Sequence, residues 1–218
     1  MMMKTLQRRT LGRLALTGLL LLGATVAVVQ PARAADETPD QFVQRISADV
    51  LQTIKSDKSI KSGDIDKIMQ LVDTMIMPNV NFERMTASAV GPAWRQATPE
   101  QQSRLEQEFK TLLVRTYAGA LDQVSDQTVS ILPFRGSTTD NEVLVRTQIK
   151  GSGDPVQLDY RLEKSPGATG GWKIYNINVL GVWLVETYRT QFAQQINAKG
   201  IDGLISVLAA RNKSGGKS

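Results

Sequence analysis

The chain has 218 residues, contains neither cysteine nor histidine, and carries a formal net charge of +5. The absence of cysteine excludes a disulfide framework and a lipid-modified cysteine. The absence of histidine excludes Ser-His catalytic triads and the usual zinc sites. Acidic residues that are close in sequence do not share a predicted helix face. We therefore expect a protein that is not an enzyme and that has no metal site and no cofactor.

The first 34 residues have the composition of a secretory signal peptide that is cleaved off. Basic residues up to Arg13 precede an apolar run over 14–29, and Ala32-Arg33-Ala34 provides the small residues of a cleavage site. This leader holds five of the 26 basic residues, and the remaining 21 equal the 21 acidic residues. A neutral mature chain has no basic field for nucleic acid. We expect export to a bacterial periplasm, by the Sec or the twin-arginine route, as a soluble protein.

The first part of the mature chain, residues 38–125, has the patterns of helices. Thr38-Pro39-Asp40-Gln41 and Thr98-Pro99-Glu100-Gln101 each combine an N-cap, a proline at the first helical position and the glutamine of a capping box. Pro78 and Gly91-Pro92 are expected to end helices. Apolar spacing then predicts four helices, over about 38–54, 64–77, 81–90 and 98–124.

From Gln127 the apolar spacing changes from the helical period to the alternation of strands. Turn residues separate four predicted strands, over about 127–132, 142–150, 155–164 and 172–179. Such strands form an antiparallel meander with one face under helices and the other in water. Two closing helices are expected, over about 182–197 and 202–210, on either side of Gly200.

The predicted architecture is α+β: one domain over 35–210 with about six helices packed against a four-stranded antiparallel sheet. Its helical part covers 38–125, and the sheet with the closing helices covers 127–210. Residues 211–218 are polar and rich in glycine, which predicts a flexible tail.

Two features of the mature chain suit ligand binding. All of its methionines fall between Met69 and Met85, and flexible thioethers suit a wall that adapts to varied ligands, although they also fill ordinary core gaps. Arg189 is flanked by Tyr188 and Phe192 on one helix face. Its guanidinium can hold a phosphate at the mouth of a pocket, or pair with a carboxylate and fix the helix on the sheet.

Two blocks of the sequence stand out together. The first block comprises Arg84-Met85, Gly91, Trp94, Gln101, Phe109, Leu112-Leu113 and Tyr117, and the second comprises Trp172-Lys173-Ile174-Tyr175, Gly181-Val182, Leu184-Val185, Tyr188-Arg189 and Phe192. In this order they resemble the MlaC, or toluene-tolerance, family of periplasmic phospholipid carriers. The likeness covers essentially the whole mature chain. Trp183, Asn81 and Asn176 depart from the residues that are common in the family.

The resemblance implies a fold and a role. The sheet would be curved, of the NTF2-like kind, and would enclose lipid tails in an interior cavity while the head group stays outside. The protein would be a monomer that shuttles phospholipid between an outer-membrane lipoprotein-porin complex and an inner-membrane ABC transport complex, which maintains the lipid asymmetry of the outer membrane.

Apolar periodicity assigns the inner wall of such a carrier to residues of both layers. They are Val145, Ile149, Leu158, Tyr160 and Ile174 on the sheet and Val72, Met75, Leu113, Tyr117, Val185, Tyr188 and Phe192 on the helices, with Arg189 as a possible head-group contact. The same pattern also describes a sheet with a filled core. An apolar groove would equally suit a periplasmic adaptor or chaperone that binds proteins, which is the alternative function.

Overall fold

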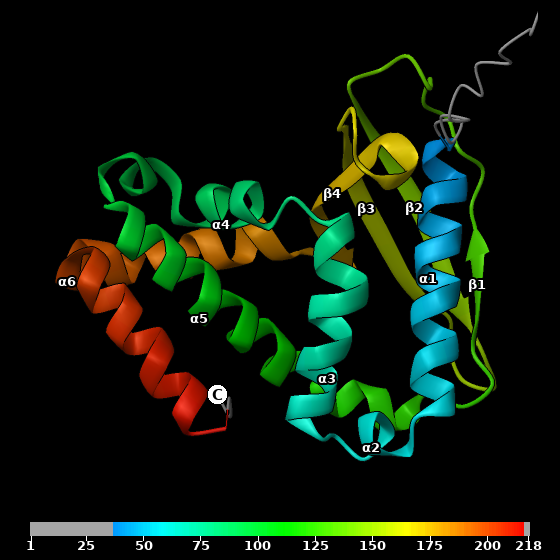
Figure 1. Cartoon of the computed structure of the whole chain (residues 1–218), viewed down its shortest axis with the longest axis horizontal. Coiled ribbons are helices and arrows are strands. Elements are labelled where there is room, and N and C mark those ends of the chain that lie inside the picture. Colours follow the sequence, from blue (N-terminus) through cyan, green and yellow to red (C-terminus); the bar gives the residue numbers. More distant parts are fainter. Residues whose placement is uncertain (1–36, 216–218) are drawn as a thin grey trace, which may run out of the picture. The chain divides into compact units, whose positions relative to one another are not determined.

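The computed structural model describes residues 37–215, which belong to one compact unit. The predicted signal peptide, residues 1–34, and the last three residues of the predicted tail lie outside the described residues. The elements follow the predicted order of helices, an antiparallel sheet and a closing helical segment (Figure 1). The fold is therefore α+β, as the sequence predicts.

Helix α1 (Pro39–Ser56) begins where the capping pattern places it. The Thr38 N–H donates to the Gln41 Oε1 at 3.3 Å, which satisfies a donor at the helix start. Phe42 and Val43 are buried on the face that the helix turns toward the sheet. In Figure 1, α1 lies across the sheet beside β1 (Thr128–Ile131), with which it makes most of its sheet contacts.

The chain between α1 and α4 is more irregular than the sequence predicts. The predicted helix over 64–77 is a succession of three backbone geometries: the α-helix α3 (Ile65–Leu71), the π turn η1 (Val72–Ile76) and the 3-10 turn η2 (Met77–Asn79). A short helix, α2 (Lys58–Lys61), precedes it. Helix α4 (Phe82–Val90) follows and is capped by the Asn81 side chain.

Helix α5 (Pro99–Tyr117) is the second helix with a complete capping box, and it is shorter than predicted. The Thr98 N–H donates to Gln101 Oε1 at 3.0 Å, and the Gln101 N–H donates to Thr98 Oγ1 at 3.2 Å. The α-helix ends at Tyr117 and not at Val124, because the backbone tightens into the 3-10 turn η4 (Ala118–Gln123). Gly119 lies in this turn and favours the end of the helix. A further 3-10 turn, η3 (Gly91–Gln96), joins α4 to α5.

The sheet has five strands in the order β1-β2-β3-β4-β5, and every neighbouring pair is antiparallel. The four predicted strands are present as β1, β2 (Glu142–Lys150), β3 (Val156–Lys164) and β4 (Trp172–Val179). A β-bulge interrupts the pairing of β3 with β4 at Arg161/Leu162, which increases the local twist of the sheet.

The fifth strand, β5 (Val182–Trp183), was predicted as the start of a helix. Leu180 and Gly181 have φ angles of 52° and 88°, so the chain reverses in two residues and Val182 pairs with Val179. Leucine rarely adopts such a conformation, so a two-residue turn that begins at Leu180 is not expected from the residue types.

The closing segment α6 (Leu184–Lys213) is interrupted at Gly200, where φ is 70° and ψ is −175°. The predicted division into two helices at this glycine is confirmed by that break. The helix extends beyond the predicted end at Ala210, so residues 211–213 are not part of a flexible tail. Asn212 is buried there, and its Nδ2 donates to the backbone and the carboxylate of Glu108.

The buried apolar residues form two clusters. The main cluster lies between the inner face of the sheet and the helices α1, α4, α5 and α6. The small cluster is built from the end of α1, α2, α3 and the end of α5. The boundary passes between Met75 and Ile76 and between Leu113 and Val114, because each pair divides between the two clusters, and Val50 packs against both.

Candidate functional site

The sheet side of the predicted wall lies where the alternation places it. Val145, Tyr160 and Ile174 are buried in the main cluster, and Leu158 is half-buried against it. Ile149 is half-buried and faces Val129 and Val156 on the neighbouring strands. Burial raises the pKa of the Tyr160 hydroxyl. These five side chains share the inner face of the sheet.

The α6 side of the wall is an aromatic cluster. Tyr188 and Phe192 stand edge-on to the Phe109 ring, with centroids 4.9 Å and 5.2 Å away, a geometry that aromatic pairs prefer. Phe82 completes the group at 5.7 Å from Phe109. Val185 is buried in the same cluster. These rings pack against one another, so α6 contributes a fixed boundary to the apolar interior.

A band of half-buried apolar residues follows the boundary between the two clusters, and we call it the seam. Its members are Val50, Val72, Met75, Ile76, Met77 and Leu113. The sequence predicted Val72, Met75 and Leu113, and it missed Val50, Ile76 and Met77. The clustering of methionines was the one signal that pointed to Met77, because periodicity cannot show where two clusters meet.

Tyr117 lies at the end of α5 and is more exposed than expected for a wall residue, with 37 % of its surface accessible. Desolvation and then the nearby Tyr188 raise the pKa of its hydroxyl. Tyr117 therefore lies at the exposed edge of the apolar interior.

Arg189 is exposed and lies beside the carboxyl end of α4. A Cβ at position 91 would be 3.6 Å from the Arg189 Nε, so the guanidinium lies over the backbone of Gly91. A cation is favourable at the end of a helix. Within residues 37–215 no carboxylate lies within ion-pair distance of Arg189. An ion pair with a carboxylate was one of the two roles that we expected for Arg189 from the sequence, and this ion pair is not formed within these residues.

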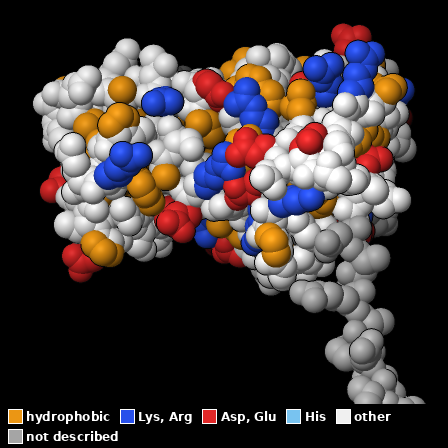
Figure 2. Space-filling model, turned by 90° about the horizontal axis from the view of Figure 1, so that it is seen from above, with side chains coloured by type: hydrophobic (Ala, Val, Ile, Leu, Met, Phe, Trp, Pro, Cys, Tyr) orange, Lys and Arg blue, Asp and Glu red, His pale blue; other side chains and the backbone are white. Residues whose placement is uncertain are grey.

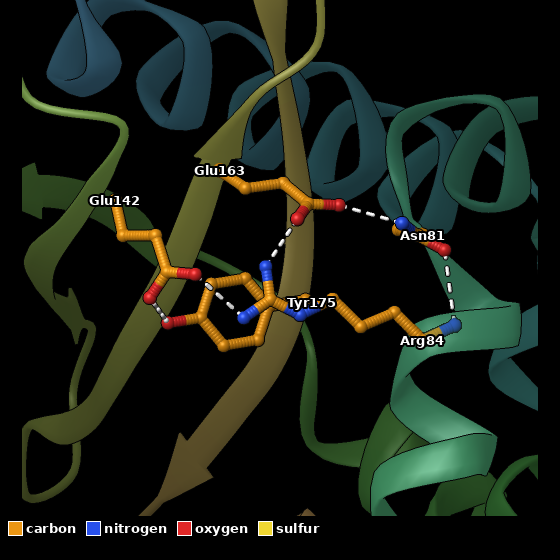
Figure 3. Close-up of polar contacts among 5 residues, drawn as sticks. All are labelled: Asn81, Arg84, Glu142, Glu163 and Tyr175. Carbon is orange, nitrogen blue, oxygen red and sulfur yellow. Dashed lines mark hydrogen bonds and ion pairs between the residues drawn. The ribbon is translucent and has the colours of Figure 1, made fainter.

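The outer face of the sheet carries a polar network that joins it to α4. Arg84 donates to both Glu142 and Glu163, and its guanidinium lies 3.7 Å over the Tyr175 ring (Figure 3). The Asn81 Nδ2 donates to Glu163 at 2.6 Å. The hydrogen bond from Arg84, followed by that from Tyr175, lowers the pKa of Glu142. This network fixes the start of α4 against three strands.

A second polar network also lies on the outer face of the sheet. Part of this face is therefore buried, although the sequence predicts that all of it is exposed to water. Arg161 lies 3.9 Å over the Trp183 ring and donates to Glu186 at 2.5 Å. The Asn176 Oδ1 accepts from the Val185 N–H at 3.2 Å, so it caps α6, whose own N-cap residue forms no side-chain cap. Asn176 is consequently 2 % exposed. Polar residues are buried here because the start of α6 returns over β4.

Two surface cavities have volumes of about 360 and about 390 Å³. The first lies beside Glu37 and Trp172, and the second lies beside Asn81 and Glu106 and is also lined by the seam residue Met77. No residue of the predicted wall lines either cavity. Among the described residues, no group of three or more acidic side chains is placed to hold a metal ion.

Figure 2 shows basic and acidic side chains interleaved over one face of the molecule. No helix in the described part of the chain is long and apolar enough to span a membrane.

Comparisons with known proteins agree with one another. The family model described as MlaC protein matches residues 44–210. The chain is 25% identical over 186 residues to the toluene tolerance protein ttg2D of Pseudomonas putida, covering 85% of this chain and 84% of that protein. It is 24% identical over 184 residues to the intermembrane phospholipid transport system binding protein MlaC of Haemophilus influenzae, covering 84% and 86%.

A solved structure is similar over nearly its full length. It is the phospholipid-binding protein of Ralstonia solanacearum, determined in complex with a phospholipid. The TM-score is 0.78, the sequence identity is 47%, and the match covers 83% of this chain and 99% of the other.

Proposed function

The chain belongs to the MlaC family, and from this we propose that it is a soluble periplasmic phospholipid carrier that performs no covalent chemistry. It holds the acyl chains of its cargo against the apolar interior between the sheet and the helices and leaves the head group outside. The predicted signal peptide supports export to the periplasm. The phospholipid complex of the Ralstonia solanacearum protein supports the choice of cargo.

The seam is the observation that carries the proposal. Its apolar side chains are half-buried between two clusters, so they can exchange contacts with one another for contacts with a lipid tail. Burying a methylene stabilises by about 0.8 kcal/mol. A two-chain lipid with about thirty methylenes therefore crosses water only when its tails are covered. The proposed lining is the predicted wall together with Val50, Ile76 and Met77, and Arg189 is a proposed head-group contact.

The carrier acts between two membranes. We infer that it exchanges phospholipid with an outer-membrane lipoprotein-porin complex and an inner-membrane ABC transport complex, as a monomer, and so maintains outer-membrane asymmetry. The balanced charge of the mature chain supports this route, because a protein without a basic field has little attraction for bare anionic membranes.

Mass spectrometry of organic extracts from the purified mature protein tests the proposal. A carrier brings about one phospholipid or more per chain, with mixed chain lengths, because apolar walls discriminate single methylenes by only about 1 to 3 kcal/mol. The same protein refolded from denaturant without lipid is the control and should yield none. An extract without phospholipid, together with copurifying polypeptides, would favour the protein-binding adaptor or chaperone instead.

A further inference from the structure

The π turn η1 and the 3-10 turn η2 form a segment, Val72–Asn79, that we call the strap. The Met77 N–H donates to the Val72 carbonyl five residues earlier, which is the bond of a π turn. Turns of this kind are rare and frequently mark functional sites. In Figure 1 the helical segment that contains the strap stands between α1 and α5, and it contacts both of them.

The strap supplies four of the six seam residues. Val72 and Met75 pack against the small cluster, whereas Ile76 and Met77 pack against the main cluster. No strap residue is fully buried. The strap therefore covers the boundary between the clusters without belonging to the interior of either. A segment that exposes little buried apolar surface when it moves away opens more easily than a helix of the core.

Both ends of the strap are held firmly. At its start, Ile68 and Leu71 are buried in the small cluster. At its end, Val80 forms a β-bridge with Ile174, and the Asn81 N–H donates to the Ile174 carbonyl at 2.8 Å. The segment between these anchors can move only by swinging about them.

The strap has few polar contacts with the rest of the protein. One lies near its anchored end, where the Lys173 Nζ donates to the Pro78 carbonyl at 3.0 Å, and two lie in its middle. The Lys110 Nζ lies 2.6 Å from the Asp73 carboxylate, in a pair whose side chains are 22% and 51% exposed. The Thr53 hydroxyl donates to the Met75 sulfur at 3.4 Å, a weak bond. Exposed ion pairs contribute little to stability. The strap is thus fastened to α5 and α1 by contacts that are easily broken.

We propose that the strap is the gate through which acyl chains enter and leave the protein. When it swings away from α5, the seam opens, and the strap methionines exchange their contacts with the clusters for contacts with the passing chain. This inference rests on the proposed carrier function. It predicts that exchange of bound lipid stops when the strap is fixed to α5.

A reversible cross-link tests the gate, because the natural chain has no cysteine to interfere. Cysteines replace Asp73 and Lys110 in one variant and are joined by a short bis-methanethiosulfonate spacer. The matched control joins Gln101→Cys to Asp202→Cys. In the natural chain the Gln101 Nε2 on α5 donates to the Asp202 Oδ1 on α6 at 2.7 Å. The readout is exchange of bound lipid for pyrene-labelled phosphatidylglycerol delivered from cyclodextrin. Linking the strap should slow exchange by about tenfold or more, and reduction should restore it, while the control keeps its rate.

Equal exchange rates with and without the strap link would overturn the gate. A protein from which no phospholipid can be extracted would overturn the carrier function as well, so the two failures are distinguishable. Lys110→Ala, which removes the ion pair between the strap and α5 without a linker, should exchange about two- to fivefold faster than wild type. Arg104→Ala, which removes an ion pair within α5, should leave the rate unchanged. Unchanged or slower exchange in Lys110→Ala would also contradict the gate.

Discussion

Arg84 and Arg161 have matching surroundings on the outer face of the sheet. Each guanidinium lies over an aromatic ring, Tyr175 in one case and Trp183 in the other, and each donates to a carboxylate. A planar guanidinium can stack and bind at the same time, which an ammonium cannot do. The two arginines thereby attach the helical layer to the sheet from the side opposite the apolar interior.

Replacing Arg84 by methionine keeps the apolar stem and removes the two ion pairs. We expect the free energy of unfolding at pH 7 to fall by about 1 kcal/mol, allowing for the screening of a partly exposed pair. Because Arg84 lowers the pKa of Glu142, this contribution is present above the ordinary carboxyl pKa and is lost as pH falls through the lowered value. Urea unfolding followed by circular dichroism at pH 7 and pH 3 measures the difference. A loss at pH 3 as large as that at pH 7 would contradict the assignment.

Leu158→Asp tests the sheet side of the wall. An aspartate there would face the apolar interior without a partner, so a folded variant should lose its bound phospholipid. Leu144→Asp makes the same change on the outer face, where the leucine is 37% exposed, and should keep its lipid. Lipid extraction from both purified variants, with folding checked by circular dichroism, gives the comparison. Wild-type lipid content in folded Leu158→Asp would remove Leu158 from the wall.

The sequence predicts which side of the sheet some residues occupy, but it does not predict the contacts of others. The alternation placed Val145 and Tyr160 on the inner face correctly, since a strand fixes the side of every residue once one is known. The position of Arg189 depends on Gly91, which is distant in sequence. The role of Asn176 depends on the β4–β5 hairpin, which returns Val185 to it, and neither contact could be predicted from a local pattern.

Helix boundaries with a strong local pattern were predictable from sequence, and the others were not. Gly91-Pro92 correctly predicted the end of α4 at Val90, whereas the last helical segment was expected to begin at Val182 and begins at Leu184. The Thr38 and Thr98 capping patterns mark the first turns of α1 and α5 because their hydrogen bonds are local. The end of α5 at Tyr117 and the π turn of the strap are marked by no capping pattern of this kind. Apolar spacing over 64–77 fits a regular α-helix equally well. The change from α-helix to π turn within the strap could therefore not be predicted from the sequence.

Gly200 shows how one residue divides an element. Its φ of 70° with a ψ of −175° is a conformation that glycine alone adopts readily, and no atom of another residue would obstruct a Cβ there. Gly200→Ala should therefore lower the free energy of unfolding by about 1 to 3 kcal/mol through backbone strain. Gly119→Ala, which meets neither a positive φ nor a close atom, is the control.

Thermal or urea unfolding of the two glycine variants separates the explanations. We expect Gly119→Ala to be neutral or slightly stabilising, as alanine is a better helix former. Equal effects of the two substitutions would show that the break in α6 is not maintained by the conformation of Gly200.

Residues 37–215 form one sheet, one helical layer and two apolar clusters, and the sequence anticipated the first two. It could not anticipate the division of the core, because periodicity shows which residues turn inward but not what each of them meets. The predicted wall consequently mixes residues buried in the main cluster, such as Val145 and Phe192, with seam residues such as Val72 and Met75.

The charge balance of residues 35–218, which remain after cleavage of the predicted signal peptide, predicts how cargo is delivered. Each lysine or arginine near an anionic bilayer would contribute about 1 kcal/mol of attraction, and residues 35–218 have no excess of them. Residues 35–218 should therefore stay in solution with protein-free anionic vesicles, and lipid transfer should accelerate greatly once the transport complex is reconstituted. Flotation with bare vesicles, or equal transfer rates with and without the complex, would indicate a membrane-surface protein.

The proposed carrier holds acyl chains against the seam and the inner face of the sheet. Photo-cross-linking with a phospholipid that carries a diazirine on one acyl chain, followed by mass spectrometry of peptides, locates the chains directly. We predict labelled peptides that contain the strap, Leu113 or Leu158. Labelling concentrated on the outer face, at peptides around Leu144, would contradict the claim.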